Sequence, residues 1–237
     1  AQAGYITAQT QLATDKEFLS TITGKSINNL SKLADDFPSV VTIRADLSQP
    51  ESVKQLLSRL RSEHQALNVL INNAGIQYNY AFGRNGEEFD KIEPEIRVNL
   101  ISPLQLCYGL IPVLEKHAGA AIVNVSSGLG LAPKKSAPVY CGTKGGMHVF
   151  TKSLRYQLEG SSIKVFEIIP PLVDTPMTEG RGSGKITPEQ LADEFVGKFG
   201  RDQFEINIGK VKLLRIIQRI SPSLADSFAA SPCPITC

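Results

Sequence analysis

The sequence predicts an α/β fold whose centre is a doubly wound, mostly parallel β-sheet. Short β-branched runs alternate with longer stretches of helical periodicity, which is typical of right-handed βαβ crossovers. The chain has 237 residues, and no composition shift or linker divides it, so one large domain is expected. Ligands of such a sheet bind beyond the carboxyl ends of its strands.

Strands are predicted where β-branched residues lie between polar or turn residues. Two strands are expected near the N-terminus, one ending near Tyr5–Ala8 and a second ending before Thr23. A late strand over Phe204–Ile208 is expected at a sheet edge. The four central strand predictions are Val40–Arg44, Val69–Asn72, Ala121–Val125 and Ile163–Ile169.

Helices are predicted from apolar spacing and from capping residues. Ser48 is expected to cap a helix that continues to about Glu63, with Pro50 in its first turn. Thr187 and Gln190 have the spacing of a capping box, which predicts a helix to about Phe199. The other predicted helices cover Phe89–Lys116, Val139–Leu158 and an amphipathic segment over Leu213–Ile220.

Composition and charge favour a small-molecule partner. The chain has 25 Lys and Arg residues against 23 Asp and Glu residues, and the two signs are interspersed, so no nucleic acid partner is expected. The most apolar long stretch, Leu100–Leu114, is too short to span a bilayer, so no membrane partner is expected. Without a charged start followed by an apolar run, the expected localisation is cytoplasmic.

Cysteine and histidine usage predicts reduced thiols and no metal. Cys107 and Cys141 fall in predicted helices, and the remaining two cysteines lie near the C-terminus without a second pair. The three histidines lack ligand spacing, so each is expected at the surface or at a helix end: His64, His117 and His148.

The most informative pattern is Y-x-x-x-K at Tyr140 and Lys144, with Ser127 thirteen residues upstream of the tyrosine. Four residues make a little over one helical turn, so phenol and ammonium share one helix face. A nearby cation favours the phenolate and is expected to lower the tyrosine pKa, which suits a proton donor or acceptor in carbonyl and alcohol chemistry. The neighbouring Ser126 is the alternative to Ser127 as the serine of this pattern.

Four motifs occur in order: Asn72–Gly75 (N-N-A-G), Asn99 in a helix, Val123–Ser127 (V-N-V-S-S) and Y-x-x-x-K. This set, spread over roughly residues 20 to 220, resembles the short-chain dehydrogenase/reductase family. Within that family, shorter segments of the chain look like the DltE-type oxidoreductases. The resemblance implies a Rossmann-type fold and a nicotinamide-dependent oxidoreductase that interconverts a carbonyl and an alcohol.

The resemblance also implies a role for each matching residue. Tyr140 would be the general acid or base, and Ser127 would hydrogen-bond the substrate oxygen where negative charge develops. Lys144 would favour the phenolate and bind the nicotinamide ribose. Asn99 would hold a water that connects Lys144 to solvent, with the alternative that its amide only caps helix backbone.

Further residues match the family's cofactor contacts. Asp46 resembles the aspartate that hydrogen-bonds adenine, although it could equally be a turn or helix-cap residue, and Leu47 would pack beside it. Asn73 would lie along the adenosine, while Asn72 would hold the central strands. Val173 and Thr175 match the segment that receives the nicotinamide carboxamide, and Tyr140 and Lys144 would contact the cofactor too.

Lys25 follows the predicted second strand in Thr23–Ser26 (T-G-K-S) and favours NADP over NAD. NAD enzymes commonly place an acidic residue here for the ribose hydroxyls, whereas a cation accommodates the 2′-phosphate. A solvated surface lysine would look the same.

The family's glycine-rich T-G-x-x-x-G-x-G loop is not found in its expected place. Gln9–Thr14 contains no glycine. The 16 residues from Thr7 to Ile22 are about eight fewer than the family uses there, and a whole βαβ unit takes about 30 residues. Either the printed sequence omits this loop or the protein lacks it. The alternative to an enzyme is therefore a non-catalytic binding or scaffold protein, and a serine hydrolase is a weaker third because Ser127 lacks a G-x-S-x-G elbow.

The predicted organisation is one dinucleotide-binding domain over residues 1–230, with a tail over 231–237. Within it, a glycine-rich lid over about 177–199 is expected to shape the substrate pocket. The resemblance implies a homodimer or homotetramer assembled through the helices of Phe89–Lys116 and Val139–Leu158.

Overall fold

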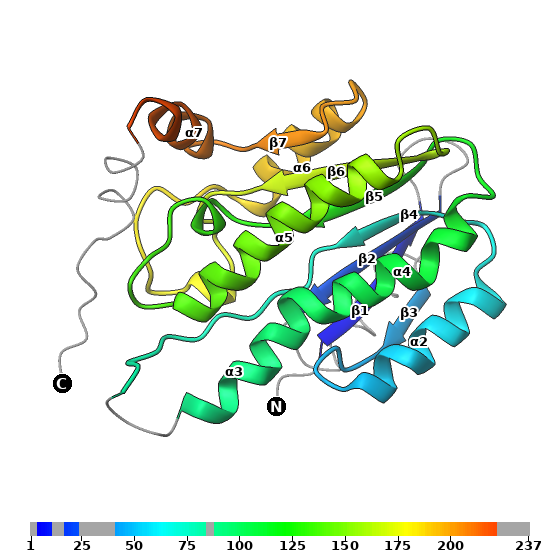
Figure 1. The fold of residues 1–237 in the computed structure, drawn as a ribbon, viewed down its shortest axis with the longest axis horizontal. Helices are drawn as coiled ribbons and strands as arrows, with labels where there is room; N and C mark the ends of the chain where they lie inside the picture. Colours follow the sequence, from blue (N-terminus) through cyan, green and yellow to red (C-terminus); the bar gives the residue numbers. More distant parts are fainter. Residues whose placement is uncertain (1–3, 11–16, 24–40, 84–87, 222–237) are drawn as a thin grey trace.

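The computed structural model describes residues 4–10, 17–23, 41–83 and 88–221, with side chains described from residue 41 onward. A seven-stranded sheet forms the centre, in the order β3-β1-β2-β4-β5-β6-β7 (Figure 1). Helices cover the sheet, so the α/β fold expected from the sequence is confirmed.

The first two strands differ from a doubly wound order. β1 (Gly4–Thr10) lies between β2 (Glu17–Thr23) and β3 (Val41–Arg44) and is antiparallel to both. β2 lies next to β4 (Leu67–Asn72) and is parallel to it. Among the described strands, β1 therefore alone runs against the common direction.

Chain length explains this reversal. Only residues 11–16 separate β1 from β2, whereas a parallel crossover needs about a dozen residues or more. The two strands therefore pair as antiparallel neighbours, with Gly4 opposite Thr23. The strands predicted near Tyr5–Ala8 and before Thr23 exist, but β1 runs antiparallel to both of its neighbours in a sheet that was expected to be mostly parallel.

The remaining strands follow the sequence prediction closely. β5 (Ala120–Val125) pairs in parallel with β4 and with β6 (Ile163–Ile169). β7 (Glu205–Asn207) adds to β6 and forms the edge of the sheet. Because β2 to β7 share one direction, the carboxyl ends of β3, β4, β5 and β6 lie at the same edge of the sheet, where the chain places its candidate site.

The helices also match, with local differences. α2 spans Pro50–Glu63, and its N-cap is Gln49 without a side-chain cap, so the prediction that Ser48 caps it is wrong. Thr187 does cap α6 (Pro188–Phe199) through the predicted box with Gln190. The other described helices are α3 (Phe89–Ile96), η2 (Arg97–Ile101), α4 (Ser102–Leu114), η3 (Gly128–Gly130), α5 (Pro138–Gln157), η4 (Pro176–Thr178) and α7 (Val211–Ile220).

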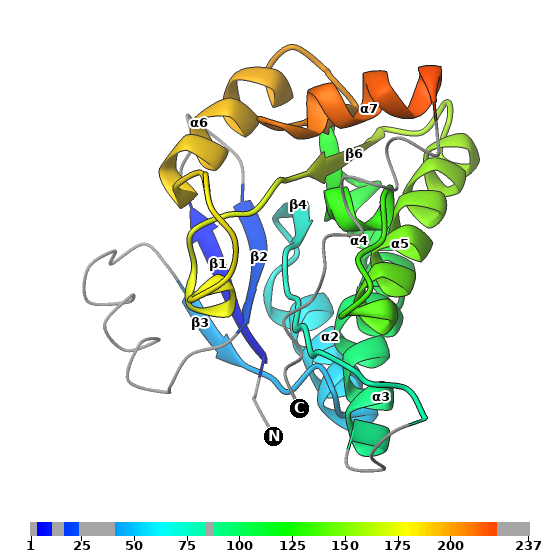
Figure 2. The same ribbon diagram turned by 90° about the vertical axis from the view of Figure 1, so that its left-hand side faces the viewer.

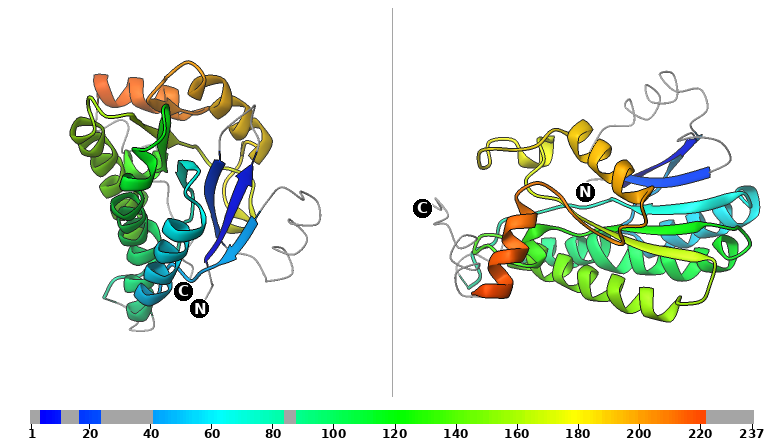
Figure 3. Two further views of the ribbon diagram at one scale, coloured as in Figure 1. Left: turned by 90° about the vertical axis from the view of Figure 1, so that its right-hand side faces the viewer. Right: turned by 90° about the horizontal axis from the view of Figure 1, so that it is seen from above.

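The sheet has a different covering on each face (Figures 2 and 3). Leu70, Ile122 and Val165 point to the face covered by α2, α4 and α5, where the larger core forms. Val123 and Phe166 point to the opposite face and pack against aromatic residues of α6, namely Phe195 and Phe199. This alternation is the period of two that a pleated strand imposes.

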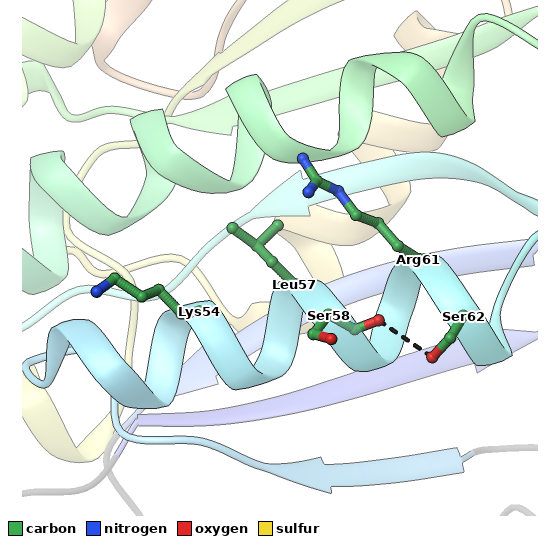
Figure 4. Close-up of a pocket in the computed structure, with 5 residues that line it drawn as sticks. All are labelled: Lys54, Leu57, Ser58, Arg61 and Ser62. Carbon is green, nitrogen blue, oxygen red and sulfur yellow. Dashed lines mark hydrogen bonds between the residues drawn. The ribbon is translucent and has the colours of Figure 1, made fainter.

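Close packing between α2 and α4 depends on Gly109. A Cβ at this position would lie 2.5 Å from Leu57 Cδ2, and Arg61 Nε donates to the Gly109 carbonyl at 2.7 Å. Leu57 and Arg61 extend from α2 toward α4 beside a surface hollow, while Ser62 donates to the Ser58 carbonyl (Figure 4). This hollow lies on the helical layer, away from the carboxyl edge of the sheet.

The continuous helical run Phe89–Leu114 is long and apolar enough to cross a membrane by length and composition alone. Half of the apolar window within this run is buried inside the protein. Residues such as Leu106, Leu110 and Leu114 pack in the larger core described above. Packing as a core helix accounts for its apolarity.

Candidate active site

The candidate site is built where β3 to β6 end. Asp46 and Leu47 follow β3, Asn73 follows β4, Ser127 follows β5, and the segment with Val173 and Thr175 follows β6. The fold thus brings to one sheet edge residues that lie far apart in the sequence. Lys25 lies outside the described residues.

α5 positions Tyr140 and Lys144 one turn apart beside this edge. The Lys144 ammonium lies 5.7 Å from the centroid of the Tyr140 ring. It also donates a hydrogen bond to the Val125 carbonyl at 2.8 Å, which ties α5 to the end of β5. Lys144 is buried, so its flexible side chain is held in one place by this bond.

Burial shifts the pKa values of both groups toward their neutral forms. Burial raises the pKa of Tyr140 to about 12, although a hydrogen bond with Ser127 lowers it. Burial lowers the pKa of Lys144 to about 8. In the protein by itself, the tyrosine pKa is therefore not lowered as the sequence predicts, because desolvation outweighs the Ser127 hydrogen bond and the Arg181 charge that lower it.

The structure separates the two neighbouring serines. The Ser127 hydroxyl shares a hydrogen bond with Tyr140 and accepts one from the Leu129 amide at 3.1 Å. The Ser126 hydroxyl instead donates to the buried Glu167 carboxylate at 2.5 Å. Alternation along the end of β5 sends the two side chains in different directions, and only Ser127 reaches the phenol.

Ser126 belongs to a network that the sequence analysis missed. His148 Nδ1 lies 2.9 Å from each carboxylate oxygen of Glu167, which also accepts the Ser126 bond. His148 is partly buried in the middle of α5, so its expected surface or helix-end location is wrong. The sequence did indicate that His148 faces inward, since it stands four residues after Lys144 and eight after Tyr140, on the same helix face.

Asn99 lies in η2, a π-helical turn between α3 and α4. Its amide oxygen accepts from the Ile76 amide at 2.8 Å, and its amide nitrogen donates to the Ile76 carbonyl and to Thr143 Oγ1. Pro103 has no N–H and cannot bond the Asn99 carbonyl as an α-helix requires, which favours the wider turn. The Asn99 side chain therefore connects the strand-end loop to α5 instead of capping its own helix.

Gly75 lies between Asn99 and Lys144. A Cβ on Gly75 would lie 3.5 Å from Asn99 Oδ1 and 3.6 Å from Lys144 Nζ. Just before it, Asn72 donates to Asn124 Oδ1 at 2.8 Å and so joins β4 to β5, as the resemblance implies. The N-N-A-G segment thus supports the strands and leaves room between the two side chains.

The predicted adenosine-side residues lie at the same edge. Asp46 accepts hydrogen bonds from the amide and hydroxyl of Ser48, so the turn role left open by the sequence is present. Leu47 is buried, and its carbonyl accepts from Ser102 Oγ at 2.6 Å. Asn73 is exposed at the end of β4.

The segment after β6 is held by backbone pairing. Val173 forms an isolated parallel bridge with Ile186, and the Asp174 amide donates to the Ile186 carbonyl at 2.8 Å. Thr175 begins η4 through a capping box with Thr178, whose hydroxyl donates to the Val173 carbonyl. These bonds fix Val173 and Thr175 beside the end of the sheet.

The residues present fit the nicotinamide half of a dinucleotide better than its pyrophosphate. A buried lysine lies beside a tyrosine and a serine, and the Val173–Thr175 segment follows the strand that ends at the same sheet edge. Because β1 is reversed, its last residue, Thr10, lies opposite Glu17 at the other edge of the sheet, away from the site. No glycine-rich phosphate turn is found within the part of the chain that the structure describes.

The fold and the site together define a nucleotide-dependent oxidoreductase. A family model for the short chain dehydrogenase matches residues 4–185, and the chain belongs to this family. It is 34% identical over 200 residues to the uncharacterized oxidoreductase DltE of Bacillus subtilis, covering 82% of this chain and 79% of that protein. It is 28% identical to the 3-oxoacyl-[acyl-carrier-protein] reductase FabG of Thermotoga maritima, covering 77% and 73%. By family, the protein is an NAD(P)-dependent oxidoreductase, and it resembles DltE.

Solved structures show the same fold. A short chain dehydrogenase from Burkholderia cenocepacia in complex with NADP has a TM-score of 0.70 at 21% identity, covering 80% of this chain and 78% of that one. A short-chain dehydrogenase from Sphingobium yanoikuyae in complex with NADPH has a TM-score of 0.66 at 22% identity, covering 86% and 83%. A 3-ketoacyl-(acyl-carrier-protein) reductase from Brucella melitensis complexed with NADH has a TM-score of 0.58 at 24% identity, covering 69% and 74%.

Proposed function

We propose that the protein is an NADP(H)-dependent oxidoreductase that interconverts a carbonyl and an alcohol at Tyr140. The observation that carries the proposal is the convergence of Ser127 and Lys144 on this tyrosine at the carboxyl edge of the sheet. A hydrolase is disfavoured because Ser127 contacts a phenol, whereas His148, on the same helix as that phenol, bonds Glu167.

The bound nicotinamide supplies or accepts the hydride. During reduction, Tyr140 gives its phenolic proton to the carbonyl oxygen while the carbonyl carbon gains the hydride, and an alcohol results. Ser127 donates a hydrogen bond to the same oxygen, where negative charge develops. The high pKa of Tyr140 keeps its proton in place until the substrate oxygen becomes basic.

Lys144 and Asn99 restore the proton of Tyr140. A pKa of about 8 allows Lys144 to exchange protons near neutral pH. Asn99 lies across Gly75 from the lysine, in the widened helical turn. As the resemblance implies, a water held beside Asn99 would connect Lys144 to solvent.

The cofactor contacts follow the strand ends. Asp46 and Leu47 would receive the adenine, Asn73 the adenosine side, and Val173 and Thr175 the nicotinamide carboxamide. NADP and NADPH in two structural relatives support a phosphorylated dinucleotide, while NADH in a third keeps NAD open. Lys25 remains the candidate partner of the 2′-phosphate.

The lid, the assembly and the localisation complete the proposal. Gly180, Gly182 and Gly184 have positive φ values, so the segment before α6 adopts turns that favour glycine. This segment is part of the proposed lid. Exposed Tyr108 of α4 and Val149 of α5 support a homodimer or homotetramer that buries this helical face. The proposed localisation is the cytoplasm.

Nicotinamide fluorescence tests the proposal directly. The purified protein, with its mass confirmed, is titrated separately with NADPH and NADH. Tight binding of NADPH and weaker binding of NADH are expected, and Lys25→Glu should reduce the difference. Binding of neither dinucleotide would refute the proposal.

A second candidate function has one observation in its favour. The β1–β2 pairing leaves no glycine-rich turn at the site edge among the described residues, which favours a non-catalytic binding or scaffold protein. If the purified protein of confirmed mass binds neither NADPH nor NADH, this candidate is supported. Binding together with carbonyl reduction would exclude it.

A further inference from the structure

Glu95 is a buried carboxylate that the proposed mechanism does not use. It is fully buried at 0% exposure in α3. It stands four residues before Asn99, so both side chains leave the helical run on nearly the same face. An apolar side chain would fill this place without the cost of burying a carboxylate, so packing alone does not explain it.

The carboxylate of Glu95 holds the loop that follows the N-N-A-G segment. The Tyr80 hydroxyl donates to one carboxylate oxygen at 2.6 Å, and the Tyr78 amide donates to the other at 3.2 Å. Tyr80 is itself buried, and its amide donates to the Ser136 carbonyl at 3.0 Å. Ser136 lies two residues before α5 begins, and α5 carries Tyr140.

Glu95 therefore joins three segments around the site. The first is the helical run with Asn99, the second is the loop from Ile76 to Tyr80, and the third is the segment that leads into α5. Asn99 makes a parallel connection, since its amide bonds the Ile76 backbone and Thr143 of α5. The two side chains fix the same loop at both of its ends.

The charge of Glu95 also reaches the site. Burial is the largest cause that raises the pKa values of Tyr78 and Tyr80 in the loop and of Tyr140 and Cys141 in α5, and the charge of Glu95 adds to it. At Tyr140, the Ser127 hydrogen bond and the charge of Arg181 act in the opposite direction. Burial raises the pKa of Glu95 itself, while hydrogen bonds from Tyr80 and Tyr78 lower it.

We propose that Glu95 is a positioning residue for the reaction at Tyr140. Its carboxylate clamps the Ile76–Tyr80 loop between the helix of Asn99 and the start of α5, and its charge influences the pH range in which Tyr140 holds its proton. This inference rests on the proposed function of Tyr140. It goes beyond that function because Glu95 touches neither substrate nor cofactor.

Three variants separate the clamp from its charge. Glu95→Ala removes both hydrogen bonds, and Tyr80→Phe removes one bond while keeping the ring. Glu95→Gln removes the charge and can keep both contacts with its Oε1 accepting from the Tyr78 amide and its Nε2 donating to the Tyr80 hydroxyl oxygen. Glu93→Ala is the matched control, because Glu93 is exposed on the same helix and pairs only with Arg97 among the described contacts. Reduction of a panel of aliphatic aldehydes, aryl ketones and β-keto esters by NADPH provides the rates.

Glu95→Ala is expected to lower kcat about 10- to 100-fold with a smaller change in KM for NADPH. Glu95→Gln should restore kcat to within about threefold of the unchanged protein. Removing the negative charge makes the phenolate of Tyr140 easier to form, so the pH profile of Glu95→Gln should move to lower pH in either reaction direction. Tyr80→Phe should fall between the two, and Glu93→Ala should match the unchanged protein.

Hydrogen exchange gives a readout that does not need activity. Glu95→Ala should speed exchange of the Tyr78 and Tyr80 amides, whereas Glu95→Gln should not. A kcat of Glu95→Ala within threefold of the unchanged protein, exchange equal to it, or a Glu95→Gln pH profile that coincides with it would overturn the proposal. If the unchanged protein reduces no carbonyl, the proposed function fails, and the exchange result still decides whether Glu95 holds the loop.

Discussion

Gly130 lies directly against the backbone of Lys144. A Cβ on Gly130 would come within 2.7 Å of the Lys144 carbonyl carbon and 2.8 Å of the Gly145 amide nitrogen. The short helix η3, which follows Ser127, therefore rests on α5 at the position of the lysine. This contact fixes the distance between Ser127 and the Tyr140–Lys144 pair.

Gly130→Ala should separate these two segments. Because the added methyl group meets backbone and not a flexible side chain, the free energy of unfolding should fall by about 1–3 kcal/mol. The displacement of Ser127 should also lower kcat/KM for carbonyl reduction by about 10-fold or more. Urea unfolding and steady-state kinetics measure the two effects.

Gly142→Ala is the matched control for this substitution. Gly142 is exposed in the same helix, and a Cβ there meets nothing within 4 Å. Because alanine favours helix over glycine, the free energy of unfolding should rise by about 0.5–1 kcal/mol with unchanged kinetics. Equal behaviour of the two variants would contradict the close contact of Gly130 with α5.

Ser126→Ala and Ser127→Ala should have opposite consequences. Ser127→Ala removes the hydroxyl that bonds Tyr140, so kcat/KM should fall by about 100-fold or more while stability changes little. Ser126→Ala leaves Glu167 buried with one partner fewer, so the free energy of unfolding should fall by about 1–3 kcal/mol. Its kcat should remain within about threefold of the unchanged protein. A large catalytic defect confined to Ser126→Ala would reverse the assignment.

The lowered pKa of Lys144 predicts a specific dependence of stability on pH. The unfolded lysine keeps its proton up to about pH 10.5, whereas the folded one loses it near pH 8. Between these values the unfolded state binds more protons, so the free energy of unfolding contributed by this group rises with pH. The rise from pH 8 to 10 should be about 2 kcal/mol.

Comparison with Lys144→Met isolates this effect. Urea unfolding of both proteins at pH 8, 9 and 10 gives the difference in stability at each pH. The unchanged protein should gain stability relative to the methionine variant across this range. A constant difference would show that Lys144 titrates in the folded protein as it does in the unfolded chain.

Local sequence signals predicted most of the fold. The strands from Val41 to Asn207 and the capping box at Thr187 follow from side-chain pattern over a few residues. The spacing of Tyr140 and Lys144 predicted that they share one helix face, and the family resemblance implied that Ser127 joins them. These features depend on short stretches of chain.

Features that depend on pairing between distant segments were not predicted. The reversal of β1 follows from a connection too short for a crossover. As a result, β1 pairs in antiparallel fashion with both β2 and β3. Glu95 and the Ser126–Glu167–His148 network depend on buried contacts between elements that sequence pattern does not link. The pKa of Tyr140 was misjudged because the spacing to Lys144 shows charge but not burial.

The most direct test of the central claim is the rate of carbonyl reduction by NADPH in Tyr140→Phe. The substitution keeps the ring and removes only the proton that the mechanism transfers. Turnover should fall by about 10²- to 10⁴-fold, while NADPH affinity measured by fluorescence stays within about threefold. A turnover within tenfold of the unchanged protein would contradict the assignment of Tyr140 as the proton donor.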